Sequence, residues 1–337
     1  MFLQGDSLAV LKAIKSESID CCVTSPPYWG LRDYGVAGQI GLESTPDAFV
    51  ARLVEVFREV RRVLKTDGTC WVNLGDSYAA NRGYQVSQSK HQSHDYGDSN
   101  ASRVPVGLKP KDLVGIPWRV AFALQADGWW LRQDIIWAKP NPMPESVRDR
   151  CTKAHEYVFL LTKAERYWWD MEAMKEPVTG GAHSRGSGVN PKAKVPSGWD
   201  TTSSNHRQLT GRYPRSKQNA SFSAAVNEVV TRRNKRSVWT IATQATPEAH
   251  FATFPLTLPE LCLKAGCRVG GIVLDPFNGA GTTGIAALKN GRRYVGIELK
   301  PEYIEISRNR MARKPKAQKK AKALPVDQTQ MLLCGGE

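Results

Sequence analysis

The sequence lacks the marks of several protein classes. It contains no run of about 18 apolar residues, the length that a membrane-spanning helix needs. Its seven cysteines are an odd number and include no CxxC pair, which argues against a disulfide framework and predicts a reducing compartment. The first residues, MFLQGD, reach an acid at once without a basic segment, so they do not resemble a secretory signal.

Acidic residues are scarce relative to basic ones. The 337 residues include 47 Lys and Arg against 32 Asp and Glu, a formal charge of +15. This excess predicts a polyanionic partner, most readily nucleic acid. Because 41% of the residues are apolar, the chain can also bury a core. Three stretches without apolar periodicity, at 79–107, 179–225 and beyond 312, are either functional loops or disordered segments.

Short apolar segments alternate with helical patterns along the rest of the chain. Thr45 and Pro46 are typical of a helix start, and apolar spacing continues that helix to Leu64. Further helices are predicted at 116–125 and 282–290. Strands are predicted at 19–23, 70–74, 133–137, 157–161, 272–274 and 294–297. Strands that alternate with helices predict a mostly parallel α/β sheet.

A glycine-rich turn follows the strand at 272–274, and we use that name for residues 275–284 (DPFNGAGTTG). Glycine lets a ligand approach the backbone, and the helix that follows offers unpaired N–H groups. Gly279, Gly281 and Gly284 match GxGxxG, and Glu298 follows Gly279 by 19 residues. This spacing is typical of a dinucleotide-binding unit that holds a ribose with its acid.

Asp275 argues against a dinucleotide. A carboxylate beside the ligand path disfavours a pyrophosphate and favours an ammonium group. The turn also lacks the GK[ST] of a phosphate-binding loop. A nucleoside that carries a cation, such as S-adenosylmethionine, therefore fits the turn better than NAD. The alternatives are a dehydrogenase that binds NAD and a turn that serves only the packing of the sheet.

A proline turn, residues 24–30 (TSPPYWG), follows the strand at 19–23. Its two prolines fix φ and remove two donors, so nearby carbonyls are free to accept from a ligand amine. Ser25 adds a hydroxyl acceptor, and the rings of Tyr28 and Trp29 can stack on a planar base. This set suits an exocyclic amino group. The alternative is a turn whose aromatic rings are packed in the core.

Together the two turns resemble the motifs of the DNA amino-methyltransferases. The family's catalytic motif, [Ser/Asp/Asn]-Pro-Pro-[Tyr/Phe/Trp], matches Ser25, Pro26, Pro27 and Tyr28, and its cofactor motif matches residues 275–283. The catalytic motif comes first, as in the permuted β group of phage and bacterial enzymes. Segments 127–141 and 155–161 are similar to this group as well.

The resemblance implies S-adenosylmethionine as the cofactor. It places Asp6 near the adenine, Glu298 on the ribose and Asp275 beside the methionine ammonium. The residues that it assigns to the cofactor are Asp6, Ser7, Thr24, Phe254, Pro255, Asp275, Phe277, Gly279, Gly281, Thr282 and Glu298.

The resemblance also implies a fold and a domain plan. The fold is a permuted methyltransferase domain, with a mostly parallel seven-stranded sheet, helices on both faces and an inserted target-recognition region. Residues 1–178 form the catalytic half, 179–235 the insert, 236–311 the cofactor half and 312–337 a basic flexible tail. The insert is either a DNA-binding region or a disordered polar segment, and loop 79–107 either closes over DNA or is merely mobile. The cations expected to contact DNA are Arg185, Lys192, Lys194, Arg207, Arg212, Arg215 and Lys217.

The implied reaction is direct methyl transfer to a base extruded from double-stranded DNA, without a metal or a covalent intermediate. The absence of a Pro-Cys dipeptide gives no support to a cytosine-C5 mechanism. In the family, serine at the position of Ser25 favours cytosine N4, and N6 of adenine is the alternative. RNA as the substrate and a non-enzymatic DNA-binding module are further alternatives.

The resemblance leaves the assembly open. A solitary enzyme, a homodimer and one half of a pair with a cognate restriction endonuclease are all compatible with the sequence. We expect the protein in the cytoplasm of a bacterial or phage-infected cell, with no membrane partner.

Overall fold

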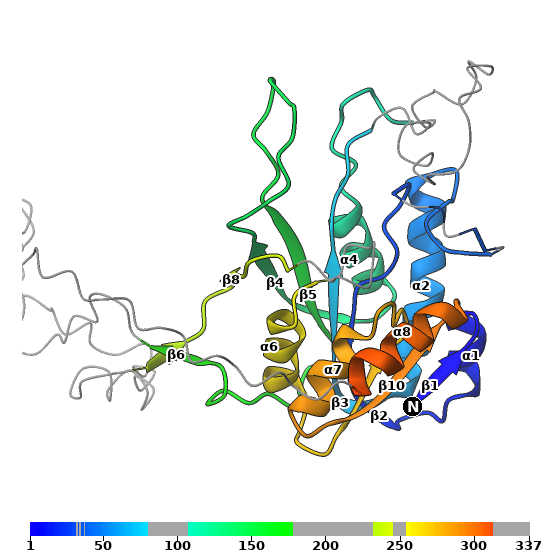
Figure 1. Ribbon diagram of the computed structural model, residues 1–337, viewed down its shortest axis with the longest axis vertical. Helices are drawn as coiled ribbons and strands as arrows, with labels where there is room; N and C mark the ends of the chain where they lie inside the picture. Colours follow the sequence, from blue (N-terminus) through cyan, green and yellow to red (C-terminus); the bar gives the residue numbers. More distant parts are fainter. Residues whose placement is uncertain are drawn as a thin grey trace, which may run out of the picture.

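A single large sheet forms the centre of the computed structural model, which describes residues 1–31, 33, 35–36, 38–79, 107–177, 232–244 and 254–312. Helices cover both faces of this sheet (Figure 1). The strands of the sheet are β1 (Phe2–Gln4), β2 (Ile19–Thr24), β3 (Leu64–Leu74), β4 (Trp130–Ala138), β5 (His155–Thr162), β8 (Val238–Thr240), β9 (Ile272–Asp275) and β10 (Arg293–Glu298).

The strand order across the sheet is β1-β10-β9-β2-β3-β5-β4-β8. Of the seven strand pairs in this described sheet, five are parallel, and only β3–β5 and β5–β4 are antiparallel. The predicted mostly parallel α/β architecture is thus confirmed. The sheet has eight strands and not the predicted seven, because the short strand β8 pairs with the end of β4. Trp137 of β4 fixes this pairing by donating from Nε1 to the Ile241 carbonyl at 2.8 Å.

The chain is permuted relative to the spatial order of its strands. Strands β9 and β10 come last along the chain but lie between β1 and β2. The glycine-rich turn after β9 therefore lies beside the proline turn after β2. The chain also leaves β9 and β2 toward opposite edges of the sheet, and such switch points are where open α/β sheets bind ligands.

Two helical layers enclose the sheet. On one face lie α1 (Ser7–Ala13), α2 (Pro46–Val63) and α4 (Ile116–Ala126), and on the other α6 (Thr257–Gly266), α7 (Thr282–Lys289) and α8 (Pro301–Ala312). Strand β2 is buried on both faces. Cys22 packs in the cluster with α2, whereas Cys21 and Val23 pack in the cluster with α6, as the two-residue period of a strand requires.

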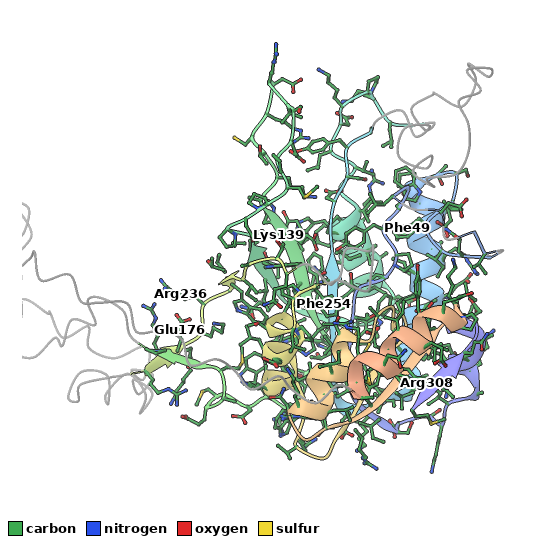
Figure 2. The ribbon with its side chains drawn as sticks, in the orientation of Figure 1. Phe49, Lys139, Glu176, Arg236, Phe254 and Arg308 are labelled. Atoms are coloured by element: carbon green, nitrogen blue, oxygen red, sulfur yellow. The ribbon has the colours of Figure 1, made fainter. Side chains whose placement is uncertain are left out.

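Helix α2 begins where the sequence predicts. The Thr45 hydroxyl accepts from the Ala48 N–H at 3.2 Å, and Pro46 occupies the first turn. Its apolar face, which includes Phe49, is buried against the sheet (Figure 2). Strand β3, however, begins directly after the helix at Leu64, six residues before the predicted start. The reason is long-range pairing, since Leu64 lies opposite Ile19 of β2.

A two-stranded sheet pairs β6 (Lys175–Pro177), just before the predicted insert, with β7 (Arg232–Asn234), which lies among the last residues of that insert. Glu176 accepts from Arg233 Nε at 3.0 Å and from Arg236 Nε at 3.2 Å, and Figure 2 shows Glu176 and Arg236 side by side. Loop residues 80–106 and tail residues 313–337 lie outside the described residues. The same holds for the predicted DNA contacts Arg185, Lys192, Lys194, Arg207, Arg212, Arg215 and Lys217.

The described ranges contain six of the cysteines, and all six are free thiols. No helix of the described chain is both long and apolar enough to cross a bilayer.

We predict that Gly281 is required by both its conformation and its surroundings. Its φ is +76°, and a Cβ atom there would lie 2.8 Å from Ser307 Oγ. Gly270 is a matched control, because its φ is +77° but a Cβ atom there would have no neighbour within 4 Å. Gly270→Ala should lower the free energy of unfolding by about 1–2 kcal/mol. Gly281→Ala should lose at least about 1 kcal/mol more through crowding. Urea unfolding measures both, and equal losses would contradict the argument.

Candidate active site

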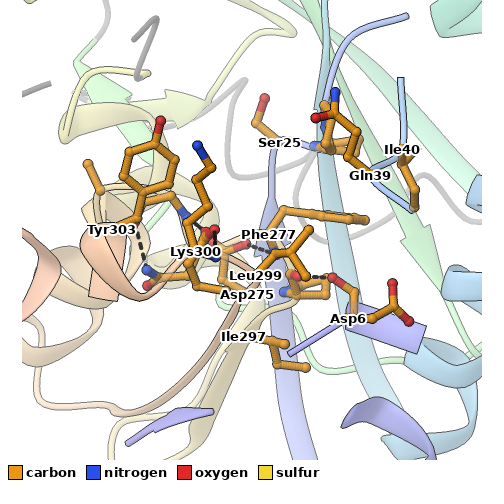
Figure 3. Close-up of a pocket in the computed structure, with 18 of the residues that line it drawn as sticks. Asp6, Ser25, Gln39, Ile40, Asp275, Phe277, Ile297, Leu299, Lys300 and Tyr303 are labelled. Atoms are coloured by element: carbon orange, nitrogen blue, oxygen red, sulfur yellow. Dashed lines mark hydrogen bonds between the residues drawn. The ribbon is translucent and has the colours of Figure 1, made fainter. Parts of the chain in front are cut away.

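A pocket of about 200 Å³ lies at the carboxyl ends of β1, β10, β9 and β2. Both turns line it, so residues about 250 positions apart in the chain share one cavity. Figure 3 shows Asp275 centrally, with Lys300 and Tyr303 on one side and Asp6 on the other. The predicted site residues that line the pocket are Asp6, Ser7, Ser25, Pro26, Pro27, Tyr28, Phe254, Asp275, Phe277, Gly279, Thr282 and Glu298.

Three predicted residues lie just behind the pocket wall. Thr24 donates from Oγ1 to Asp275 Oδ1 at 2.7 Å. Gly281 is the left-handed residue at the start of α7. Pro255 is buried, and its carbonyl accepts from the Leu258 N–H at 3.0 Å near the start of α6. These residues shape the site through the backbone or through a neighbour.

Asp275 places a buried carboxylate in the pocket. It is only 2% exposed, and it also accepts from the Phe277 N–H at 3.0 Å. Burial raises the pKa of this carboxyl to about 6, while the hydroxyl of Thr24 opposes the shift. At neutral pH a charged carboxylate therefore lies in a poorly solvated position, where a ligand cation would compensate it.

Glu298 adds a second, half-buried carboxyl at the end of β10. Its Oε2 accepts from the Gly279 N–H at 2.8 Å, and its Oε1 accepts from the Lys300 N–H at 3.0 Å. Burial raises the pKa of Glu298 above its usual range. Since a carboxylate oxygen has two acceptor positions, each oxygen can still take a ligand hydroxyl. A pocket with acids in these places fits a cationic nucleoside and disfavours a pyrophosphate.

Asp6 and Ser7 connect helix α1 to the pocket. Asp6 caps the helix by accepting the Ala9 N–H on Oδ1 at 3.0 Å. Ser7 donates from Oγ to the Pro276 carbonyl at 2.5 Å. This bond joins residues 269 positions apart and fixes the glycine-rich turn against the N-terminal segment.

The proline turn presents one aromatic ring to the pocket. Tyr28 lines the cavity, and its hydroxyl donates to Glu156 Oε2 at 2.7 Å. Trp29 instead is buried in the core and donates from Nε1 to the Glu43 carbonyl at 2.9 Å. Of the two rings that the sequence offered for stacking, only Tyr28 lies in the pocket.

Sequence reasoning missed several residues of the pocket wall. Gln39 and Ile40 reach it from the segment that follows the proline turn, and Lys300, Tyr303 and Ile306 reach it from around the start of α8. For Lys300, Tyr303 and Ile306 the position in the sequence was a usable signal, because residues 299–306 directly follow β10, which ends at the predicted site residue Glu298. Glu156 had no such signal, since its role depends on a contact with Tyr28 across the sheet.

Within the described residues, no group of three or more His, Cys, Asp or Glu side chains could hold a metal ion. The site combines carboxylate and hydroxyl acceptors with ring faces, and Lys300 adds a cation at its wall. It can bind a cation, hydroxyl groups and a planar group.

The fold and this pocket define an S-adenosylmethionine-dependent methyltransferase. Residues 19–309 match the family model N6_N4_Mtase, described as DNA methylase, and the chain belongs to that family. Type II methyltransferase M.Cfr9I of Citrobacter freundii is 46% identical over 311 residues, which cover 91% of this chain and 86% of the relative. Type II methyltransferase M.SmaI of Serratia marcescens is 44% identical over 311 residues, covering 92% and 90%.

Solved structures share the fold. The PvuII DNA methyltransferase, named as cytosine-N4-specific, superposes with a TM-score of 0.59 at 19% identity, over 94% of this chain and 87% of that chain. A DNA modification methylase of Thermus thermophilus, solved in complex with S-adenosylmethionine, gives a TM-score of 0.53 at 23% identity, over 92% and 94%. The predicted methyltransferase fold is thereby confirmed.

We predict a pH-dependent stability that depends on Asp275. Its folded pKa of about 6 lies above the usual 3.8, so the stability it contributes is present below pH 3.8 and lost as pH rises through 6. At pH 8 the buried charge costs the ligand-free protein about 3 kcal/mol. Asp275→Asn retains an acceptor for Thr24 without the charge, so the variant should gain stability relative to wild type between pH 4 and pH 8. Urea unfolding across that range measures the gain, and parallel stability curves would contradict it.

Proposed function

We propose that this chain methylates the exocyclic N4 of cytosine in double-stranded DNA by direct transfer to an extruded base. The single observation that carries the proposal is the shared pocket. Ser25 and Tyr28, which suit a base with an amino group, line the same cavity as Asp275 and Glu298, which suit a cationic nucleoside.

The acids would hold S-adenosylmethionine, with Glu298 on the ribose hydroxyls, Asp275 beside the ammonium group and Asp6 near the adenine. When bound, the cofactor supplies a methyl group on a positively charged sulfur. Phe254 and Phe277 give the pocket apolar walls. The chain's own contribution is to neutralise the positive charge of the cofactor and to orient it. Asp275 and Glu298 can do so because hydrogen bonds from the protein already fix both carboxyl groups.

The proline turn would hold the base. The Ser25 hydroxyl and the Pro26 carbonyl accept the hydrogens of the amino group, which leaves the nitrogen lone pair directed into the pocket. The Tyr28 ring stacks on the base, which must leave the duplex because its reacting atom is not reachable in the helix. Orientation of this kind is worth about 7–11 kcal/mol in favourable systems. The scheme needs neither a metal nor a covalent intermediate.

Two observations favour cytosine as the base. Ser25 is a neutral acceptor, and serine at this position favours cytosine N4 in the amino-methyltransferases. The PvuII enzyme, which shares the fold, is named as cytosine-N4-specific. The family model includes N6 enzymes as well, so methylation of adenine N6 is the competing outcome.

We also propose that residues 179–235 recognise the target sequence, between the 1–178 and 236–311 halves of the catalytic domain. Between Arg185 and Lys217 the insert contains seven cations and one acid, Asp200, and the basic residues after 312 add a sequence-independent attraction to phosphates. The curated relatives are named type II methyltransferases, which supports a cognate restriction endonuclease as partner. Such an enzyme would act in the cytoplasm, where the genome is. A homodimer is compatible with the sequence, as is a monomer.

The modified base is the first prediction of this proposal. The protein should be expressed in a host without DNA methyltransferases, and its DNA digested to nucleosides for mass spectrometry. N4-methylcytosine should appear in wild-type cells and be absent with Ser25→Ala. N6-methyladenine in its place would refute the choice of cytosine, and the absence of both would refute the function.

The second prediction separates the two halves of the pocket. Tyr28→Ala removes the stacking ring, so methyl transfer to DNA should fall roughly 100-fold while the affinity for S-adenosylmethionine stays within about twofold. Glu298→Ala is the matched variant, and it should weaken cofactor affinity instead. Calorimetric titration and a filter-binding methylation assay provide the two readouts. Equal loss of both properties in Tyr28→Ala would contradict the assignment.

A further inference from the structure

We propose that Glu156 is a positioning residue for methyl transfer, which acts with Asn73 and Lys139 to hold the Tyr28 ring in its stacking orientation. The inference rests on the proposed function, because it takes Tyr28 as the residue that stacks on the base. Glu156, Asn73 and Lys139 do not line the pocket, so they act through the tyrosine and not on a ligand.

The tyrosine hydroxyl is the centre of a compact polar network. Tyr28 donates to Glu156 Oε2 at 2.7 Å and lies 3.4 Å from Asn73 Oδ1. Asn73 Nδ2 donates to the same Oε2 at 3.1 Å and to the Tyr157 carbonyl at 3.1 Å. Lys139 donates from Nζ to Glu156 Oε1. The network therefore engages both carboxylate oxygens.

The register of three adjacent strands brings these side chains together. Asn73 lies on β3 opposite Val158 of β5, and Glu156 comes two residues before Val158 on the same face of β5. Glu156 itself lies opposite Trp137 of β4. Lys139 follows that strand by one residue and is the diagonal neighbour, a spacing that long side chains can bridge. Figure 2 shows Lys139 where β4 leads into the projecting hairpin.

The network is shielded from solvent. Asn73 is 3% exposed, and the side chains of Glu156 and Lys139 are 15% and 18% exposed. The Lys139 ammonium also lies 4.4 Å from the centre of the Trp137 ring. Burial and the Glu156 charge raise the pKa of the Tyr28 phenol well above its usual range, so its hydroxyl remains a donor at any working pH.

Gly75 restricts the ring on another side. A Cβ atom at position 75 would lie 2.6 Å from Tyr28 Cε2, so the ring packs directly against the backbone that follows β3. The ring is thus held by its hydroxyl at Glu156 and by contact at Gly75. A base that stacks on it meets a fixed plane.

A purely structural role does not account for this arrangement. A phenylalanine would fill the same space without a buried acid, and buried ion pairs are weak evidence for stability because desolvation offsets their attraction. The Glu156 carboxylate orients the ring, because its hydrogen bond to the Tyr28 hydroxyl limits how far the ring can tilt. Pre-organisation of this kind lowers the reorganisation needed before reaction.

The test is a double-mutant cycle on the full-length protein with Tyr28→Phe, Glu156→Gln and the double variant. Single-turnover transfer of a tritiated methyl group to unmodified genomic DNA gives the rate, and calorimetric titration gives the affinity for S-adenosylmethionine. Each single variant should slow transfer about tenfold, the range for a hydrogen bond to a charged group. The double variant should be no slower than the slower single variant, because Tyr28→Phe removes the donor of this hydrogen bond and Glu156→Gln removes the charge that strengthens it. Cofactor affinity should stay within about twofold in all three.

A matched control is the Lys65–Asp20 pair, at 2.7 Å near the opposite end of β2. Asp20→Asn breaks that ion pair in the same sheet and should leave the transfer rate unchanged. The proposal would be overturned by any of three results. The losses in transfer rate could multiply in the double variant, the rate could be unchanged in Glu156→Gln, or the affinity for S-adenosylmethionine could fall in parallel with the rate. Should Glu156→Gln fail to fold, Lys139→Gln tests the same coupling, and its effect must vanish in the Tyr28→Phe background.

This experiment is independent of the choice of base. Methylation of adenine by the wild-type protein would refute the cytosine assignment and leave the coupling between Tyr28 and Glu156 measurable. Normal transfer by Tyr28→Ala would refute the stacking role, and the positioning role would then fail with it.

Discussion

The hydrogen bond from Thr24 to the buried carboxylate of Asp275 joins the proline turn to the glycine-rich turn. Thr24 ends the strand that leads into the proline turn, and Asp275 begins the glycine-rich turn. The bond lies between the ends of β2 and β9, from which the chain continues toward opposite edges of the sheet. Open α/β sheets bind their ligands at such points. The acid is kept ionised at neutral pH at a cost in stability. We propose that the cost is retained because the site binds a cation.

The charge of the pocket is opposite to that of the whole chain. The protein has a formal charge of +15, yet the residues that line the cavity include Asp6, Asp275 and Glu298. The two charges suit two partners. A basic chain attracts a polyanion over a long range, whereas an acidic cavity favours a small cation at short range. Under the proposed function the chain must bind both at once, and this division of charge disfavours a phosphate in the pocket.

Sequence reasoning predicted the parts of this site that depend on local chemistry. The cap at Thr45, the strand into Asp275 and both turns are local patterns, and the structure brings the two turns to one pocket. It failed where long-range pairing decides. Strand β3 begins at Leu64 because that residue pairs with Ile19 of β2. Trp29 does not face the pocket, because its ring is packed in the hydrophobic core. The network at Glu156 depends on contacts between segments that are far apart in the chain, which no local pattern encodes.

The central claim is that Asp275 is the counter-charge of the cofactor. Near pH 6 about half of the ligand-free protein carries a proton on this carboxyl. A cation that binds beside it must displace that proton. Calorimetric titration with S-adenosylmethionine at pH 6, in two buffers of different ionisation enthalpy, counts the protons released. The account predicts release of about half a proton by the wild-type protein and none from this position in Asp275→Asn. Equal proton release by the two proteins would contradict it.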